Sequence, residues 1–278
     1  MAVSVNLRSF LRVSVVLLAM FVLVNCASTP EDDPEAIAEY GKINDPAEPT
    51  NRWIFSFNQG LDKAIVKPVT GLYRAIFPDF IRQSIHNFLT NLKTPIILAN
   101  DILQGEPERA SDTVARFFIN STVGVAGFRD QAADWGFERH TEDFGQTMAV
   151  WGVGEGPYIM LPILGPSTPR DAIGTVVDWF LDPINWWVAA DTDRAWIGYT
   201  RTVINGIGTR DQLWDVLENL EKSSIDFYAA VRSLYRQRRN DDISNGAGSD
   251  KNETPGFTGD FELADPEDAP DKVSGTKK

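Results

Sequence analysis

The chain contains a single cysteine, Cys26, which limits how its fold can be stabilised. Without a second cysteine, no disulfide can form within the chain. Residues 1–25 have a short basic start and an apolar run from Val15 to Val24, a combination typical of a secretory signal. This run is shorter than the roughly 20 residues that a helix needs to cross a bilayer. The remaining residues, 26–278, must therefore be held together by packing rather than by cross-links.

The junction Leu23-Val24-Asn25-Cys26 resembles the cleavage site of a bacterial lipoprotein signal. In such signals the cysteine thiol receives a diacylglycerol, the leader is removed, and the cysteine becomes the first residue. Asn25 departs from the pattern, which usually has Gly, Ala or Ser there. Ala27 follows, rather than the aspartate of an inner-membrane retention signal. We expect Cys26 to be lipidated and held at the outer membrane; a free cysteine in an uncleaved anchor is the alternative.

Acidic residues gather at the two ends of the chain that follows the leader. Residues 27–50 carry seven acids and one base, and residues 240–278 carry ten acids and four bases. Both segments are rich in Pro, Asp, Glu, Ser and Gly, a composition typical of disorder. We expect an acidic flexible tether over residues 26–50 and a disordered acidic tail over 240–278, with an acidic docking arm as the alternative for the tail. The charge argues against a nucleic-acid partner, because no net basic face can neutralise phosphates.

Residues 51–239 are expected to carry the fold as one helical domain. Apolar residues recur there at three- and four-residue intervals, the pattern of helices with one apolar face. The first such stretch covers residues 53–65 and the second residues 80–92, after which Pro95 should break or kink the helix. Glu106-Pro107-Glu108 should open a third helix, since proline suits the first turn and acids suit its positive end.

A longer helix is predicted from a capping box at Thr209 and Gln212 to about Arg239. Four arginines lie near the end of this helix: Arg232, Arg236, Arg238 and Arg239. Their positive charges suit the helix dipole there. Contact with anionic lipid headgroups is the alternative role. Residues 121–169 hold many Gly and Pro and no long periodic run, so little strand is expected there. The sequence thus predicts an all-α fold with one irregular, Gly/Pro-rich connector.

Aromatic residues are numerous, with eight Trp and sixteen Phe. Trp179, Trp186 and Trp187 fall within nine residues. Tryptophan suits a membrane–water boundary, because its ring is apolar and its N–H is polar. An ordinary aromatic core is the alternative, and the sequence leaves both open.

The residues show no convincing catalytic or metal-binding set. The chain has two histidines, His86 and His140, and lacks the G-x-S-x-G turn that many Ser-His-Asp lipases use. His140 lies beside Arg139 and several acids, where a salt-bridged surface cluster is the simpler interpretation. Two isolated histidines without a second cysteine do not favour zinc. We expect no enzyme activity, no cofactor and no metal site.

Three longer motifs make the sequence recognisable: NLKTPIILANDILQG at residues 91–105, ARFFINSTVGVAGFRD at 115–130, and EDFGQTMAVWGVGEGPYIMLPILGPSTPRDAIG at 142–174. With Asn44-Asp45-Pro46, Glu48, Asn51-Arg52 and Phe57-Asn58, they resemble the VacJ/MlaA family of outer-membrane lipoproteins over roughly residues 40–235. Thr50 and Ala126 stand where the family often has Phe and Gly.

The resemblance implies a mostly helical, ring-like domain embedded in the inner leaflet of the outer membrane. Members of this family provide an amphipathic channel for phospholipids misplaced in the outer leaflet. The lipids pass to a soluble periplasmic carrier and onward to an inner-membrane complex, and family members associate with trimeric porins. The implied partners are phospholipid, the outer membrane, the carrier and a porin. A non-transporting adaptor or scaffold lipoprotein of the envelope is the first alternative, and a phospholipase or acyltransferase acting through His140 is the second.

We expect two groups of site residues beside Cys26. Glycines can turn the backbone with positive φ or allow a close approach, so a Gly/Pro-rich segment could gate or line a lipid channel. The residues expected in this loop are Gly152, Gly154, Gly156, Pro157, Tyr158, Leu161 and Pro162. The second group is the N-terminal part of the family motif: Asn51, Arg52, Phe57 and Asn58.

Overall fold

Helices make up nearly all the regular structure of residues 44–245, the part of the chain that the computed structural model describes. The leader, Cys26, residues 26–43 of the expected tether and residues 246–278 of the tail lie outside this part. The chain enters through α3 (Glu48–Leu61), a π-helical turn (Asp62–Val66) and α4 (Lys67–Ile76). Then α5 (Asp79–Gln104) and α6 (Pro107–Thr122) lie side by side.

The second half alternates short elements with longer helices. Proline and capping side chains start many of the helices, as where Thr168 Oγ1 accepts the Asp171 N–H before α9. The elements are α7 (Gln131–Asp134), α8 (Phe144–Val150), β1 (Ile159–Leu161), β2 (Gly165–Ser167), α9 (Pro169–Leu181), α10 (Pro183–Ala189), a 3₁₀ turn (Thr192–Arg194), α11 (Ala195–Gln212), α12 (Trp214–Ser223) and α13 (Phe227–Ile243).

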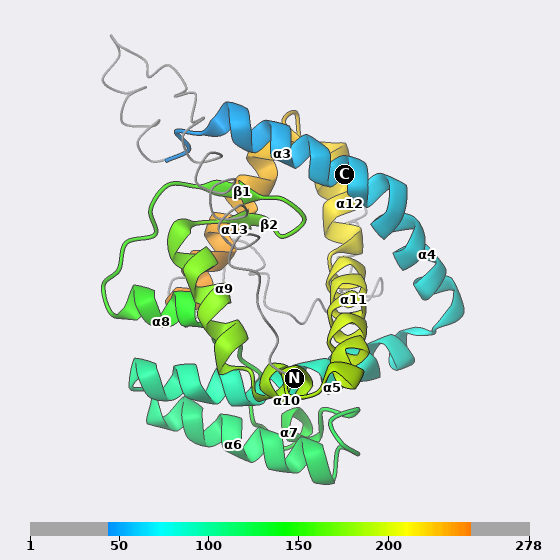
Figure 1. Ribbon diagram of the computed structural model, residues 1–278, viewed down its shortest axis with the longest axis vertical. Helices are drawn as coiled ribbons and strands as arrows, with labels where there is room; N and C mark the ends of the chain where they lie inside the picture. The colour runs from blue at the N-terminus through cyan, green and yellow to red at the C-terminus, as the bar shows by residue number, and fades with distance from the viewer. Residues whose placement is uncertain (1–43, 246–278) are drawn as a thin grey trace, which may run out of the picture.

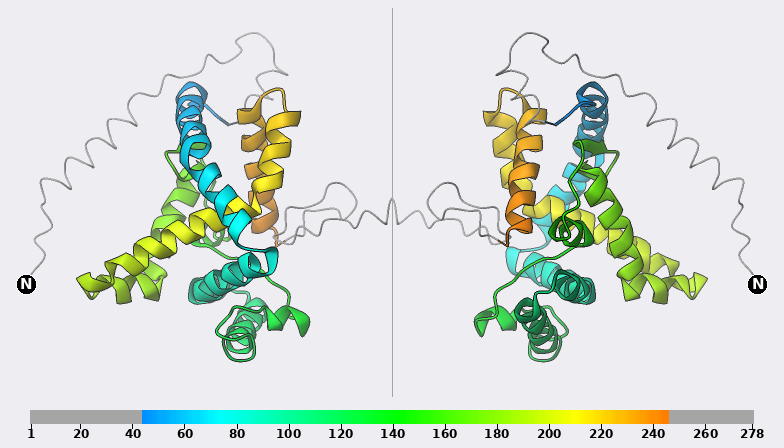
Figure 2. Two further views of the ribbon diagram at one scale, coloured as in Figure 1. Left: turned by 90° about the vertical axis from the view of Figure 1, so that its right-hand side faces the viewer. Right: turned by 90° about the vertical axis from the view of Figure 1, so that its left-hand side faces the viewer.

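The helices are arranged as a ring (Figure 1). In that view α3 and α4 form the upper right, α11 and α12 run down the right, α5, α6 and α10 form the lower edge, and α8, α9 and the strands close the left side with α13. The strands pair antiparallel, with Met160 opposite Pro166. Figure 2 shows α10 and the start of α11, drawn in yellow-green, projecting to one side of the ring. The prediction of a mostly helical fold is confirmed.

Polarity is distributed in an unusual way across the described residues. Most of the fully buried side chains are polar or charged, among them Asn51, Asn100, Asp101 and Thr147. The buried hydrophobic set is small and centres on Tyr158, with Met160 and Tyr228. Large apolar side chains are exposed on most of the helices, though not on α7, α12 or α13. The apolar face predicted over residues 53–65 is one of the exposed faces, with Trp53 71% exposed.

The structure excludes the helix break that was one of the two outcomes expected at Pro95, and it corrects a second helix prediction. Pro95 does not break its helix, since α5 continues through it from Asp79 to Gln104. Packing against α6 holds this helix together although proline removes one backbone hydrogen bond. The single helix predicted from Thr209 to Arg239 is wrong, because three helices cover that stretch. Thr209 lies inside α11, where its hydroxyl donates to the Asn205 carbonyl rather than capping a new helix.

The folded part also extends beyond the boundaries expected at residues 51 and 239. Asp45, expected in the flexible tether, is fully buried. At the other end, α13 continues to Ile243. The Gly/Pro-rich connector contains α7, α8 and a short hairpin of two three-residue strands, which agrees with the little strand expected there. Among residues 44–245, none of the helices has the length and apolar content needed to cross a bilayer.

Candidate functional site

The two groups of expected site residues meet where α3 lies against the hairpin. Asn51 Nδ2 donates to the Tyr158 carbonyl at 3.1 Å, and Asn51 Oδ1 accepts the Met160 N–H at 2.9 Å. Two turns further along α3, Asn58 repeats this arrangement: its Nδ2 donates to the Leu161 carbonyl and its Oδ1 accepts the Ile163 N–H. Residues seven apart share a helix face. The two asparagines therefore fix the hairpin by acting as side-chain partners for its backbone.

Residues before α3 fix the C-terminal end of the glycine loop, Gly152–Gly156. Asn44 Nδ2 donates to the Gly156 carbonyl at 2.7 Å, and its own carbonyl accepts the Tyr158 N–H at 2.8 Å. Asp45 accepts from Asn51 Nδ2, Tyr228 Oη and Arg232 Nη1 at 2.5–2.7 Å. The motif Asn44-Asp45 thus ties the start of the fold to the hairpin and to α13.

The other two residues of the N-terminal group do not join this contact. Arg52 turns towards α13, where its guanidinium pairs with Asp226 at 2.5 Å and lies over the Tyr228 ring. Phe57 is 51% exposed on the outer face of α3. The structure therefore brings together Asn51 and Asn58 with the loop, but not Arg52 or Phe57.

The glycine loop runs from the end of α8 to β1, on the left of Figure 1. Gly152 and Gly156 have φ of +88° and +75°, a conformation that side chains disfavour, and a Cβ on Gly156 would also lie 3.2 Å from Pro169. Gly154 has neither constraint. Tyr158 is fully buried, whereas Leu161 and Pro162 lead into an exposed hairpin tip at Ile163 and Leu164.

A buried ion network joins α8, α9 and α13 behind this loop. Arg239 donates to Asp143 at 2.6 and 2.7 Å and to Asp171 at 2.8 Å, and Tyr235 Oη donates to Asp171. Burial by itself raises the pKa of Asp143 and Asp171, but the Arg239 charge outweighs it and holds both below their usual values. The network fixes α13 against residues 142–174, the longest motif. Arg170, 3.0 Å from Asp171, supplies the second cation that balances the two carboxylates.

Two glycines in that motif allow this close packing. A Cβ on Gly174 would lie 2.7 Å from Gly145 Cα, and a Cβ on Gly145 would lie 2.8 Å from Asp171 Oδ1. Helices α8 and α9 can therefore approach only because both positions lack a side chain. Sequence reasoning did not single out Gly145, Gly174 or the acids of the network; their presence in the longest motif was the available signal.

The arginines grouped near residue 239 all have acidic partners within this chain. Arg232 pairs with Asp45, Arg236 with Glu155 at 2.5 Å, and Arg238 lies 4.0 Å from Asp242. These contacts pair the group with acids of the same chain, although Arg238 stays 45% exposed. Neither the helix dipole nor a lipid headgroup is needed to account for them.

His140 is largely buried rather than part of a surface cluster. Its Nε2 lies 2.9 Å from Thr113 Oγ1 and 3.2 Å from Asp101 Oδ1, while Thr113 Oγ1 donates to Asp101 at 2.6 Å. In a nucleophile–base–acid relay, the hydroxyl and the carboxylate face different ring nitrogens. Here both face the same nitrogen, and Thr113 is 3% exposed. This arrangement joins α5 to α6 and does not activate a nucleophile.

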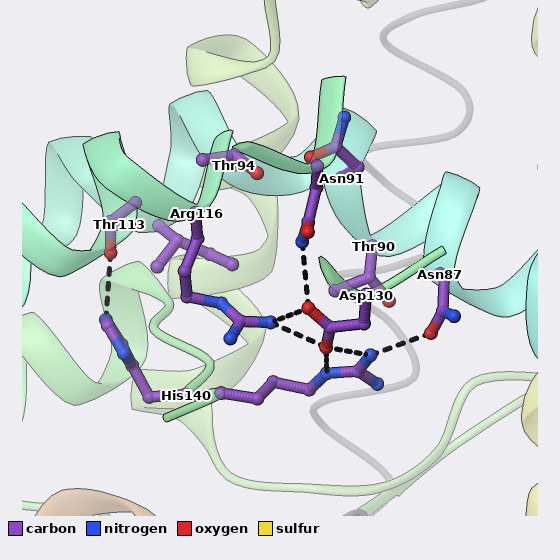
Figure 3. A pocket seen from close by; sticks show the side chains of 11 residues that line it. Asn87, Thr90, Asn91, Thr94, Thr113, Arg116, Asp130 and His140 are labelled. Atoms are coloured by element: carbon purple, nitrogen blue, oxygen red, sulfur yellow. Dashed lines mark hydrogen bonds and ion pairs between the residues drawn. The ribbon is translucent and has the colours of Figure 1, made fainter. Parts of the chain in front are cut away.

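Asp130 and His140 both line a small polar cavity next to α5 and α6 (Figure 3). Arg116 and Arg139 each donate to Asp130 at 2.7 Å, and Asn120 donates at 2.9 Å. Burial opposes ionisation of this carboxyl, but these donors hold its pKa at about 2. The adjoining cavity is about 30 Å³, room for about one water molecule. Among residues 44–245, no group of His, Cys, Asp or Glu is placed to hold a metal ion.

These features define a class of protein: a helical ring with buried, ion-paired polar groups and many exposed large apolar side chains. The chain belongs to the MlaA lipoprotein family, whose sequence profile matches residues 43–242. It is 36% identical over 249 residues to the intermembrane phospholipid transport system lipoprotein MlaA of Escherichia coli K12, covering 88% of this chain and 93% of that protein. The Haemophilus influenzae protein of the same name is 30% identical, over 83% and 89%.

A solved structure agrees with this assignment. It is described as "Structural basis for maintenance of bacterial outer membrane lipid asymmetry", is 36% identical in sequence, and superimposes with a TM-score of 0.63. The match covers 72% of this chain and 98% of the solved one. An uncharacterized Rickettsia prowazekii protein is also similar, with 33% identity over 71% of this chain and 77% of its own length.

Proposed function

We propose that this chain is the outer-membrane lipoprotein component of an intermembrane phospholipid transport system. It removes phospholipids misplaced in the outer leaflet and passes them to a periplasmic carrier, which maintains lipid asymmetry. Membership of the MlaA lipoprotein family supports this role. In this proposal Cys26 carries the lipid anchor at the periplasmic face, and a trimeric porin is the neighbour in the membrane.

The observation that carries the proposal is the large number of exposed apolar side chains. Each Å² of apolar surface left in water forfeits roughly 25 cal/mol, and soluble monomers seldom expose large contiguous apolar patches. Here the exposed apolar residues occur on α3, α4, α6, α9, α10 and α11. Acyl chains or an apolar partner would remove this cost. We infer that the ring sits in the inner leaflet of the outer membrane without crossing it.

The tryptophans of the projecting helices are suited to the edge of that leaflet. Trp179, Trp186, Trp187 and Trp196 lie on α9, α10 and α11 and are each more than half exposed. Tryptophan side chains favour the membrane–water interface. The alternative of an ordinary aromatic core does not fit this exposure.

Fluorescence quenching tests the placement of these tryptophans. In vesicles that contain a brominated phospholipid, the emission of the full protein should fall strongly, while aqueous iodide should quench it little. Trp196→Ser should remove part of the bromine-sensitive emission and leave the circular dichroism unchanged. Strong quenching by iodide with none by the brominated lipid would show that the exposed apolar side chains face water, against the proposal.

We infer further that the Gly152–Gly156 loop gates lipid passage, with Pro157, Tyr158, Leu161 and Pro162 forming its continuation. Gly154 is the sharpest test position, because it has open space around it and no positive φ. Gly154→Val should leave folding and membrane targeting intact but cause phospholipid to accumulate in the outer leaflet. Gly206→Val is a control in α11, also with open space around it. Normal surface lipid in Gly154→Val cells would contradict the gating role.

A further inference from the structure

Lys93 differs from the other cations of residues 44–245. Every other lysine and arginine there has an acidic partner within 4.0 Å. For Lys93, in the middle of α5, the structure shows neither an ion pair nor a hydrogen bond, and the residue is exposed. In a chain with more acids than bases, a cation left without an acid is available for an external anion.

The position of Lys93 on its helix shows which way it faces. The face of α5 towards α6 carries Asn91, which donates to Ser121, and Asp101, which accepts from Thr113. Leu89, four residues before Lys93, lines a cavity of about 220 Å³ shared with α11. Asn100, seven residues after it, donates to Asp178 of α9. Residues four and seven apart lie on one helix face, so Lys93 faces the space between α9 and α11.

The charges nearest to Lys93 leave it uncompensated. Asp182, at the start of α10, favours the charged form of Lys93. Arg201, in the middle of α11, disfavours it. They are paired to each other at 2.5 Å and are largely buried, so they cancel. Surrounding protein lowers the pKa of Lys93, with Arg201 adding to that effect. Lys93 is therefore an exposed cation beside an ion pair whose charges cancel.

The surface next to this pair is apolar. Asp182 is directly preceded by Trp179, Phe180 and Leu181 and followed on α10 by Trp186 and Trp187, and all five side chains are exposed. A single exposed cation without an acidic partner, beside an aromatic surface, matches a ligand with one anionic group and long apolar chains. Free phosphate would satisfy the cation but gain nothing from the aromatic residues.

We propose that Lys93 binds the phosphate of a phospholipid whose acyl chains lie along the exposed aromatic side chains of α9 and α10. This inference rests on the proposed function and names the group on this chain that receives the headgroup. Lys93 makes no internal polar contact, so replacing it should alter lipid binding without disturbing the fold. Its ammonium can donate to any phosphodiester, whichever alcohol the headgroup carries.

The test measures binding of fluorescently labelled phosphatidylglycerol to the purified full-length protein in neutral detergent micelles. Lys93→Gln should weaken binding about tenfold, the order expected for one charged hydrogen bond. Lys93→Arg should restore most of it. Labelled diacylglycerol, which lacks the phosphate, should bind native protein and Lys93→Gln equally. Lys222→Gln, which removes an exposed lysine paired with Glu218, should bind phosphatidylglycerol like native protein.

The outcomes separate this inference from the proposed function. If native protein and Lys93→Gln bind phosphatidylglycerol equally, the Lys93 site is wrong while lipid binding stands. If inorganic phosphate displaces the labelled lipid at matched ionic strength and binds by itself as tightly, the site belongs to a free anion and the proposal is overturned. If native protein binds no phosphatidylglycerol, the proposed function itself fails.

Discussion

Asn51 and Met160 are hydrogen-bonded through the Met160 N–H and Asn51 Oδ1, 2.9 Å apart, although 109 positions separate them in the chain. The same amide donates to the Tyr158 carbonyl, so one side chain satisfies two backbone groups of the hairpin. Asn51 is 3% exposed, which leaves no water to replace these bonds. The relationship makes the hairpin part of the α3 wall of the ring, rather than an appendage.

Asn51→Ala is therefore predicted to destabilise the whole ring. It leaves the Met160 N–H and the Tyr158 carbonyl buried without a partner, at about 1–3 kcal/mol for each. We expect the free energy of unfolding in detergent to fall by about 2–4 kcal/mol. Ser56→Ala, on the exposed face of the same helix, should change it by under about 0.5 kcal/mol. Equal effects of the two substitutions would contradict the role given to Asn51.

Gly174 and Gly206 should respond in opposite ways to alanine. Both lie inside helices, where alanine ordinarily stabilises by up to about 1 kcal/mol. A Cβ on Gly206 meets nothing within 4 Å, so Gly206→Ala should raise the free energy of unfolding. A Cβ on Gly174 would press into the Gly145 backbone, and Gly174→Ala should lower it by about 1–3 kcal/mol or more. Urea unfolding of the pair gives the sign directly, and a stabilising Gly174→Ala would refute the close packing of α8 on α9.

Asp178 on α9 should make stability depend on pH in the weakly acidic range. Burial raises the pKa of this carboxyl to about 6, although Phe144 and Asn100 both donate to it. Its value in an unfolded chain is about 3.9. Because the folded protein holds the proton more tightly, this contribution is complete below about pH 4 and is lost as pH rises through about 6, amounting to about 3 kcal/mol.

The comparison that isolates this effect is native protein against Asp178→Asn. Carboxyls with lowered pKa, such as Asp130, lose their stabilisation as pH falls and so act with the opposite sign. Subtracting the two proteins' free energies of unfolding at each pH removes those contributions. Between about pH 4 and pH 7, the free energy of unfolding of Asp178→Asn should rise by about 2–3 kcal/mol relative to that of native protein. A difference that stays constant would mean that Asp178 titrates normally.

The sequence predicted the class of fold but not which side of each helix faces inward. The spacing of Trp53, Phe57 and Ile65 correctly indicated a helix. It did not indicate whether the apolar face of that helix is buried or exposed. Periodicity records only that one face is apolar. It does not show whether protein, water or lipid contacts that face. The buried polar groups around Asn100 and Thr147 were therefore not predicted.

Contacts between residues far apart in the chain could not be predicted from the sequence, for a different reason. Asn51 and Asn58 were selected with the glycine loop as separate groups, and only the fold brings them within hydrogen-bond distance. The breaks at Leu213 and Ser224 likewise lack a Gly or Pro signal. Local propensity there favours one long helix, and tertiary contacts, such as Tyr228 with Asp45, decide otherwise.

The most direct test of the central claim is the amount of phospholipid in the outer leaflet of cells that lack this protein. Surface phospholipid should rise in those cells, the native chain should return it to normal, and Cys26→Ala should not. Unchanged surface phospholipid in the deletion strain would contradict lipid removal and favour an adaptor lipoprotein of the envelope.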